Sequence, residues 1–310
     1  MNEEVKNSCV SASDFVRVDR GMDSDVIARP SISYWKDVWR RLKTDKVAII
    51  CMVYLLIVIA MAVLAPLLSQ YSYDSTNLSH LNEGPSAAHW FGTDQAGRDL
   101  WARIWVGARI SLLIGFGGAV VPMIVGTLIG GISGYFGGWV DMVIMRIIDV
   151  GACIPDLVYI TLIMLFLGAG PGSIVIAIAI SGWMGTARSV RGRMLQFKNR
   201  EFVLASRTLG GSGLHQIFSS ILPNILGQQV VSLTSMIPAA IFMEAYLSFI
   251  GLGVASPMTS WGQLAQTGQK VFRQYPYQLF IPGVIISVTI LAFYLFGNSL
   301  RDAMDPHLRN

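Results

Sequence analysis

The chain has 310 residues, of which 53% are hydrophobic and only 14% are charged, so it carries more apolar surface than a soluble domain could bury. This composition predicts a membrane protein. The formal net charge of +4 is small and the basic residues lie beside apolar segments, which argues against nucleic acid as a partner and for contact with membrane lipid. The three cysteines form no CxxC pair, which argues against a disulfide framework.

The first 46 residues predict a cytoplasmic amino-terminal tail (1–46) that ends in a membrane anchor. Residues 1–33 are polar and mixed in charge, and we expect them to be flexible. Residues 34–46, "YWKDVWRRLKTDK", contain five basic residues and two tryptophans directly before an apolar run. Basic residues on the cytoplasmic side and tryptophans at the interface are typical of such anchors.

Six apolar segments predict six transmembrane helices. The first, at residues 47–69, is uncharged over 47–68 and is long enough to cross the hydrocarbon core of a bilayer. The second contains seven glycines, which would let neighbouring helices approach closely. The second to sixth segments are approximately residues 110–135, 140–167, 173–186, 225–254 and 278–297.

The basic residues set the predicted orientation. Residues 188–207, after the fourth segment, contain six basic residues and one acidic residue, so this loop should be cytoplasmic. An even number of spans then places both termini in the cytoplasm. Two polar loops, residues 69–108 and 255–277, fall outside the membrane on the opposite side.

The first of these loops is expected to hold an amphipathic helix within residues 70–107, capped by Thr93 or Asp94. Two interpretations of this helix remain open, an interfacial anchor and a plug or docking surface for an external binding protein. Its apolar strip would be Leu100, Trp101, Ile104 and Trp105.

No catalytic motif is present, so the chain is not expected to be an enzyme. Its four histidines show no HExxH or other metal-ligand spacing, and the chain has no GxSxG nucleophile elbow. It also has no GxxxxGK[ST] phosphate loop, so any ATP-driven work must come from a partner.

A hairpin is predicted within the basic loop, where residues 201–223 read "EFVLASRTLGGSGLHQIFSSILP". Residues 201–209 favour a helix, and Gly210 with Gly211 can adopt the left-handed conformation that ends it. Ser212 can cap a second short helix, which Pro223 would end or redirect. On shape alone, the hairpin could dock into a partner or lie on the inner membrane surface. The apolar residues of its second helix are Leu214, Ile217, Phe218, Ile221 and Leu222.

The hairpin resembles the EAA motif of ABC importer permeases in three places: Ala205-Ser206, Gly210 and Leu222-Pro223. The resemblance implies that this segment forms coupling helices, which sit in a groove of the ATPase subunits. Leu204 stands where the motif has a glutamate and Ser206 where it has a second alanine. Glu201, one turn earlier, could substitute for the missing glutamate. The implied coupling residues are Glu201, Leu204, Ala205, Ser206, Gly210, Leu222 and Pro223.

Four further segments resemble the oligopeptide, dipeptide and nickel permease group, in particular its second (C-type) permease subunit. The resemblance extends over residues 35–306. The segments are "HWFGTDQAGRDLWARIWVGARISLLIG" (89–115), "RIIDVGACIPDLV" (146–158), "LSFIGLG" (247–253) and "LRDAMDP" (300–306).

This resemblance implies an all-α polytopic membrane protein with six transmembrane helices and the type I ABC importer permease fold, in a bacterial cytoplasmic (inner) membrane. The importer core would occupy residues 108–297 and a cytoplasmic carboxyl-terminal tail residues 298–310. The implied partners are a homologous second permease subunit, two ABC ATPase subunits and an extracytoplasmic solute-binding protein. No cofactor is expected on this chain, because ATP and Mg would bind the ATPases.

The implied solute is a dipeptide or oligopeptide, and nickel, glutathione or another small solute stays open as an alternative. A secondary transporter or channel without ATPase partners is the alternative from a different functional class.

Four charged residues within the predicted spans are candidates for the translocation path or for polar pairing inside the membrane. Arg146 and Asp149 lie three residues apart, so we expect them to pair on one helix face. Asp156 follows Pro155, which can kink the span and expose backbone carbonyls to a cavity. Glu244 has no obvious partner on its own helix, so it either bonds to another span or lines the path.

Overall fold

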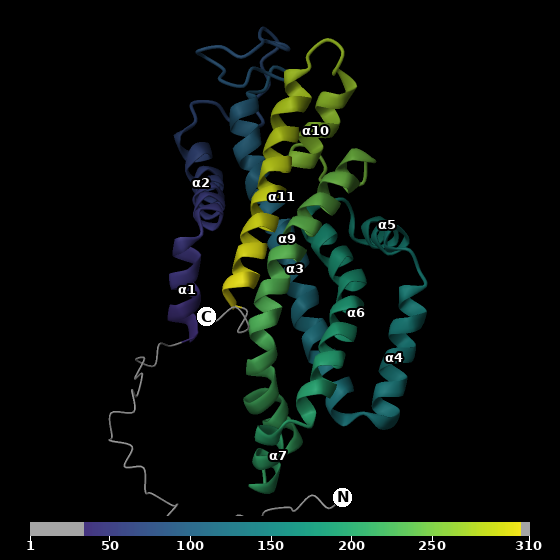
Figure 1. Ribbon diagram of the computed structural model, residues 1–310. Coiled ribbons are helices and arrows are strands. Elements are labelled where there is room, and N and C mark those ends of the chain that lie inside the picture. The colour runs from purple at the N-terminus through teal and green to yellow at the C-terminus, as the bar shows by residue number, and fades with distance from the viewer. Residues whose placement is uncertain (1–33, 305–310) are drawn as a thin grey trace, which may run out of the picture. The chain divides into compact units, whose positions relative to one another are not determined.

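The computed structural model describes residues 34–304, which are mostly helical (Figure 1). The predictions for residues 1–33, and for the last residues of the carboxyl-terminal tail, lie outside the described residues. The helices are α1 (Tyr34–Thr44), α2 (Lys46–Leu68), α3 (Leu100–Phe136), α4 (Gly138–Ala152), α5 (Asp156–Leu167), α6 (Pro171–Lys198), α7 (Glu201–Thr208), α8 (Gly213–His215), the π-helical turn η2 (Gln216–Ile221), α9 (Leu222–Phe249), α10 (Trp261–Lys270) and α11 (Tyr277–Met304).

Within residues 34–304, five helical segments are long and apolar enough to cross a membrane: α2, α3, α6, the continuous helix from α8 through α9, and α11. A sixth crossing exists only if α4 and α5 together count as one span. These two helices meet at an angle of 85°. The expectation of one helix over residues 140–167 is therefore wrong, although the predicted kink at Pro155 is confirmed, because Pro155 directly precedes α5.

Helix α3 begins at residue 100, earlier than predicted, because Asp99 caps it. The Asp99 carboxylate accepts a 2.8 Å hydrogen bond from the Ala102 N–H. The amphipathic helix expected within residues 70–107 is thus the first part of α3, and neither Thr93 nor Asp94 caps it. The predicted core boundary at residue 108 falls inside this same helix.

Glycines let α3 pack closely on α6, as the sequence predicted. Gly126, Gly130 and Gly134 recur at intervals of four residues and so share one helix face. A Cβ atom added at Gly126 would lie 2.7 Å from the Trp183 carbonyl oxygen, and one at Gly130 would lie 2.9 Å from the Ala187 Cα. Any side chain at these positions would push the two helices apart.

Helices α6 and α11 extend well beyond their apolar segments. Helix α6 continues to Lys198 because its charged residues find partners on α4, which are described below. Helix α11 continues to Met304, so residues 298–304 of the predicted tail are helical. Leu300 and Met304 are buried there against Ala48 of α2 and Val231 of α9.

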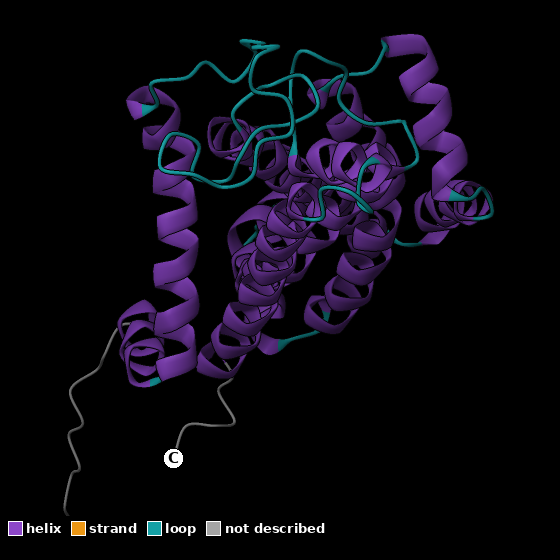
Figure 2. Cartoon of the chain, turned by 90° about the horizontal axis from the view of Figure 1, so that it is seen from above, coloured by secondary structure: helices purple, strands orange, loops and turns teal. Residues whose placement is uncertain are grey.

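Residues 69–99 and α10 cover one end of the long helices, called here the loop end; the opposite end, which carries α7, is called the hairpin end (Figures 1 and 2). Helix α10 was not predicted. Its Trp261 is fully buried and donates a 3.1 Å hydrogen bond to the Ile104 carbonyl of α3. The loop between residues 255 and 277 is therefore partly an ordered helix packed on the core.

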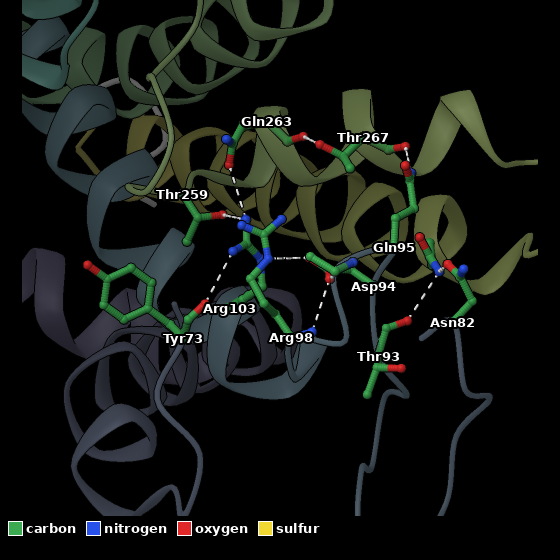
Figure 3. Close-up of polar contacts among 12 residues, drawn as sticks. Tyr73, Asn82, Thr93, Asp94, Gln95, Arg98, Arg103, Thr259, Gln263 and Thr267 are labelled. Atoms are coloured by element: carbon green, nitrogen blue, oxygen red, sulfur yellow. Dashed lines mark hydrogen bonds and ion pairs between the residues drawn. The ribbon is translucent and has the colours of Figure 1, made fainter. Parts of the chain in front are cut away.

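Residues 69–99 are fastened to the helices by buried polar groups (Figure 3). The guanidinium of Arg103 on α3 is 1% exposed and lies 3.5 Å from the Asp94 carboxylate. It also donates hydrogen bonds to the Tyr73 carbonyl at 3.2 Å and to the Thr259 hydroxyl at 3.3 Å. Gln278 of α11 donates a 3.1 Å bond to the Thr93 carbonyl. A charge this deeply buried needs such partners, so the segment is held rigidly.

Candidate functional site

The hairpin predicted from residues 201–223 begins as expected. Helix α7 ends at Thr208, and Gly210 follows with φ +87°, in the left-handed region. The Gly211 N–H donates a 3.0 Å hydrogen bond to the Ser206 carbonyl, which closes the turn. A Cβ atom at Gly210 would meet no atom within 4 Å. Glycine is thus needed there for its backbone conformation and not for space.

The second arm of the hairpin differs from the prediction. Ser212 caps it as expected, accepting a 3.3 Å hydrogen bond from the His215 N–H. The arm does not end at Pro223, because α8, η2 and α9 form one continuous helix up to Phe249. Pro223 lies in the first turn of α9, where a missing N–H is tolerated. The hairpin is therefore one short helix joined to the end of a long span.

Buried apolar contacts anchor the hairpin. Val203 of α7 packs with Ile217 and Ile221 of η2 and with Met194 of α6, and all four are at most 4% exposed. Gln216 is also buried, and it accepts a 2.7 Å hydrogen bond from the Tyr135 hydroxyl of α3. A displacement of α7 must consequently displace the ends of α6 and α9.

The opposite face of the hairpin is exposed and apolar. Leu209 at the turn is 89% exposed, and Leu204 of α7 is 46% exposed. The predicted apolar stripe of the second arm is divided between the two faces, since Ile217 and Ile221 are buried whereas Leu214 and Phe218 are exposed. Among the implied coupling residues, Glu201, Leu204, Ala205, Gly210 and Pro223 are exposed, and Ser206 and Leu222 are half-buried.

The predicted pairing of Arg146 with Asp149 is wrong. The Asp149 carboxylate accepts a 2.6 Å hydrogen bond from Arg188 of α6, and Arg146 is exposed on α4. A second pair that sequence analysis missed joins Asp141 of α4 to Arg191 of α6 at 2.5 Å. Both arginines come from the neighbouring helix, so these contacts fasten α4 to α6 instead of stabilising α4 alone.

Glu244 is fully buried, and hydroxyl groups from three parts of the chain surround its carboxylate. Its Oε1 accepts hydrogen bonds from Ser248 at 2.8 Å and Ser260 at 2.6 Å, and its Oε2 accepts one from Ser111 of α3 at 2.9 Å. The expectation that α9 offers it no partner is wrong, because Ser248 lies one turn later on α9. Glu244 also bonds across to another span, as one of the two alternatives anticipated.

A cavity of about 190 Å³ lies between α3, α5, α6 and α9. The residues that line it from α3, α6 and α9 fall near the middle of those helices. Asp156, the first residue of α5, is exposed and is the only ionisable residue among the described residues that line the cavity. The other lining residues include Pro122, Ile160, Ser181, Met236 and Met243.

Comparison with known protein families identifies the family to which the chain belongs. Residues 126–310 match the family described as binding-protein-dependent transport system inner membrane component. The chain belongs to this permease family. Residues 33–85 of the permease match the N-terminal TM domain of oligopeptide transport permease C. The resemblance inferred from its sequence is thereby confirmed.

Individual relatives agree with this assignment. The permease is 44% identical over 287 residues to the oligopeptide transport system permease protein OppC of Bacillus subtilis (strain 168), covering 93% of this chain and 94% of the relative. It is also 44% identical over 292 residues to the dipeptide transport system permease protein DppC of the same organism, covering 94% and 91%. A glutathione transport system permease protein GsiD of Pectobacterium atrosepticum is 37% identical, covering 89% and 92%.

The fold agrees with a solved transporter. A chain of the inward-facing MetNI methionine ABC transporter superimposes with a TM-score of 0.50 at 16% identity, covering 64% of the permease and 93% of that chain. The predicted all-α polytopic fold of type I ABC importer permeases is confirmed, with the third predicted span replaced by the bent pair α4 and α5.

Proposed function

We propose that this permease is the second (C-type) membrane subunit of an ATP-driven importer of dipeptides and oligopeptides, in which it forms half of the translocation pathway. The observation that carries the proposal is the similarity to two permeases named for oligopeptide and dipeptide transport, at 44% identity over more than nine tenths of the chain. A homologous permease subunit would supply the other half of the pathway. It would face the open side of the mid-span cavity.

The hairpin is proposed to couple the permease to two ABC ATPase subunits, which would bind ATP and Mg. Its exposed apolar residues, above all Leu204 and Leu209, suit a groove on a partner. Its buried side is fixed to α6 and α9. Motion of the ATPases would therefore reach these two spans, and nucleotide binding would shift the population between outward-open and inward-open states. Glu201 would replace the acidic contact that Leu204 cannot make.

The proposed orientation places the hairpin end and both termini in the cytoplasm of a bacterial inner membrane. Six basic residues between Arg188 and Arg207 support it. Residues 69–99 and α10 would then face outward, where an extracytoplasmic solute-binding protein delivers its cargo. Their rigid fastening through Arg103 and Gln278 suits a docking surface, because a preordered surface loses little entropy on binding.

Glutathione is the second candidate solute, because one relative of similar coverage is named for glutathione transport. Glutathione is itself a modified tripeptide, so the two candidates differ in the solute and not in the mechanism.

Affinity purification from native membranes in mild detergent tests the assembly, and uptake tests the solute. We expect two ATPases and a second multi-span protein to co-purify, and the reconstituted complex to take up dipeptides and tripeptides only with ATP. Recovery of the chain alone, with solute transport that needs no ATPase, would contradict the proposal and favour a secondary transporter. Uptake of glutathione without uptake of other peptides would favour the second candidate.

A further inference from the structure

Asp156 differs from the other acidic residues in α4, α5 and α9. Asp141 and Asp149 are paired with arginines of α6, and Glu244 accepts hydrogen bonds from three serines. Within residues 34–304, the Asp156 side chain makes no hydrogen bond or ion pair. It does not cap α5 either, since the residue at the cap position is Pro155 and no side chain bonds there. Its place in the first turn of α5 suits the positive end of the helix dipole, but no described side chain pairs with its carboxylate.

The surroundings of Asp156 indicate the chemistry of a ligand. It lines the mid-span cavity of about 190 Å³, whose other walls carry no charge. An unpaired carboxylate in an uncharged wall favours a cationic group, because charge-assisted hydrogen bonds are the strong ones. None of the described residues that line this cavity is basic, so the cavity offers no comparable partner to a carboxylate of the solute.

The uncharged walls of the cavity suit a variable solute. Met236 and Met243 of α9 are unbranched and polarisable, and such side chains adapt to different shapes. Peptides differ in their side chains but share an amino terminus, which carries a positive charge near neutral pH. The carboxylate would bind the amino terminus that all peptides share, and the adaptable apolar wall would accommodate the side chains in which they differ.

We propose that the Asp156 carboxylate receives the protonated amino terminus of the peptide as it passes the mid-span cavity, and so makes a free amino terminus a determinant of transport. This inference rests on the proposed peptide-import function. It makes Asp156 a specificity-determining residue of the pathway. Glu244 has a different role, because it is fully buried and its carboxylate already accepts three hydrogen bonds.

The test uses the complete transporter, with its ATPases, second permease and binding protein, in proteoliposomes. Uptake of trialanine is compared with uptake of N-acetyl-trialanine, which has no amino-terminal charge. Occupancy of the binding protein is measured for each peptide, and each uptake rate is divided by that occupancy. This correction removes any preference of the binding protein itself.

We expect Asp156→Asn to lower the corrected uptake of trialanine about tenfold, the effect of losing one charge-assisted hydrogen bond, and to leave that of N-acetyl-trialanine unchanged. Asp156→Glu should retain most of the uptake. Asp302→Asn is the matched control, because Asp302 is exposed at the end of α11 and does not line the cavity. It should change neither rate.

A second variant moves the charge within the same cavity. Ser181 also lines it, so Ser181→Asp in the Asp156→Asn background should restore the preference for the free amino terminus. An equal fall for both peptides, without such rescue, would show that Asp156 only supports the fold and would overturn the inference. Unchanged uptake of both peptides by Asp156→Asn would overturn it too.

Failure of the underlying function has a different signature. In that case the wild-type complex, fully assembled and active as an ATPase, would import neither trialanine nor its acetylated form. If the same complex imported a divalent metal cation instead, and lost that import in Asp156→Asn, the carboxylate would serve a metal solute and the amino-terminus inference would be wrong.

Discussion

The Glu244 carboxylate of α9 accepts a 2.9 Å hydrogen bond from the Ser111 hydroxyl of α3, in a site closed to solvent. Ser111 also accepts a 3.0 Å hydrogen bond from the backbone N–H of Trp261, and Ser260, which caps α10, donates to the same Glu244 carboxylate. One acidic side chain thus joins two spans to α10 at the loop end. Buried networks of this kind stabilise one arrangement strongly, because every member depends on the others.

Glu244→Ala should destabilise the permease by about 1–3 kcal/mol, because it removes the acceptor shared by three buried hydroxyls. Glu244→Gln should cost less, since it keeps one acceptor oxygen. Thermal unfolding of the purified permease in detergent measures both. Ser287→Ala, at an exposed position of α11, is the control and should be neutral. Equal midpoints for Glu244→Ala and this control would refute the structural role of the network.

Gly210→Val should uncouple ATP hydrolysis from solute uptake. Valine would have to adopt φ +87°, a conformation that costs a β-branched residue roughly 1–3 kcal/mol, so the turn after α7 would change shape. Insertion into the membrane should be unaffected, because the position is exposed. ATPase activity and uptake of the reconstituted complex are measured together.

Gly283→Val is the matched control for Gly210, because Gly283 also has free space around it but no left-handed backbone. Gly210→Asn should retain most of the coupling, since asparagine tolerates the left-handed region. Normal coupling in Gly210→Val would mean that the turn does not determine the function of the hairpin.

Gly130→Ala should destabilise the packing of α3 on α6. The added methyl group would lie 2.9 Å from the Ala187 Cα, too close for any contact without a shift of the helices. Overpacking of this kind costs about 1–3 kcal/mol. The adjacent Gly131→Ala is the control, because its methyl group would lie at an ordinary 3.5 Å from Met194. The thermal midpoint should fall for the first variant and stay near wild type for the second.

Asp149 and Arg188 should show a small, specific coupling energy. Both side chains are about half exposed, 53% and 47%, so solvent screens the pair and its contribution should be below about 1 kcal/mol. A double-mutant cycle with alanine, read by thermal unfolding, measures it. The same cycle on Asp149 and Arg146 should give no coupling. The reverse result would restore the pairing expected from spacing on one helix.

Local features of the hairpin were predictable because they depend on neighbouring residues. A glycine with positive φ and a serine cap act within a few positions, so the end of α7 and the start of the second arm followed from the sequence. Whether Pro223 ends one helix or begins another did not follow from the sequence. A proline can end a helix or begin one, and the preceding π-helical turn, which joins it to α8, decided between these.

Partners of buried and paired charges could not be inferred in the same way. Spacing of three residues made Arg146 the obvious partner of Asp149, but Arg188, 39 positions away, reaches it across the interface with α6. Ser111 lies 133 positions from Glu244. Only Ser248, four positions from Glu244, was within reach of a local argument.

By itself, the sequence determined that the chain is a multi-span membrane protein with a glycine-turned hairpin in a basic loop, because apolar length, charge bias and turn residues act locally along the chain. The permease family followed from the resemblance of its motifs to those of that family. The tertiary structure alone decided that α4 and α5 bend apart by 85°, that Glu244 is enclosed by serines, and that Asp156 lines a cavity with no partner among residues 34–304. The physical reason is that packed helices bring together side chains that are far apart in the sequence. Contacts of this kind produce no periodic pattern in the sequence, so they could not be predicted from it.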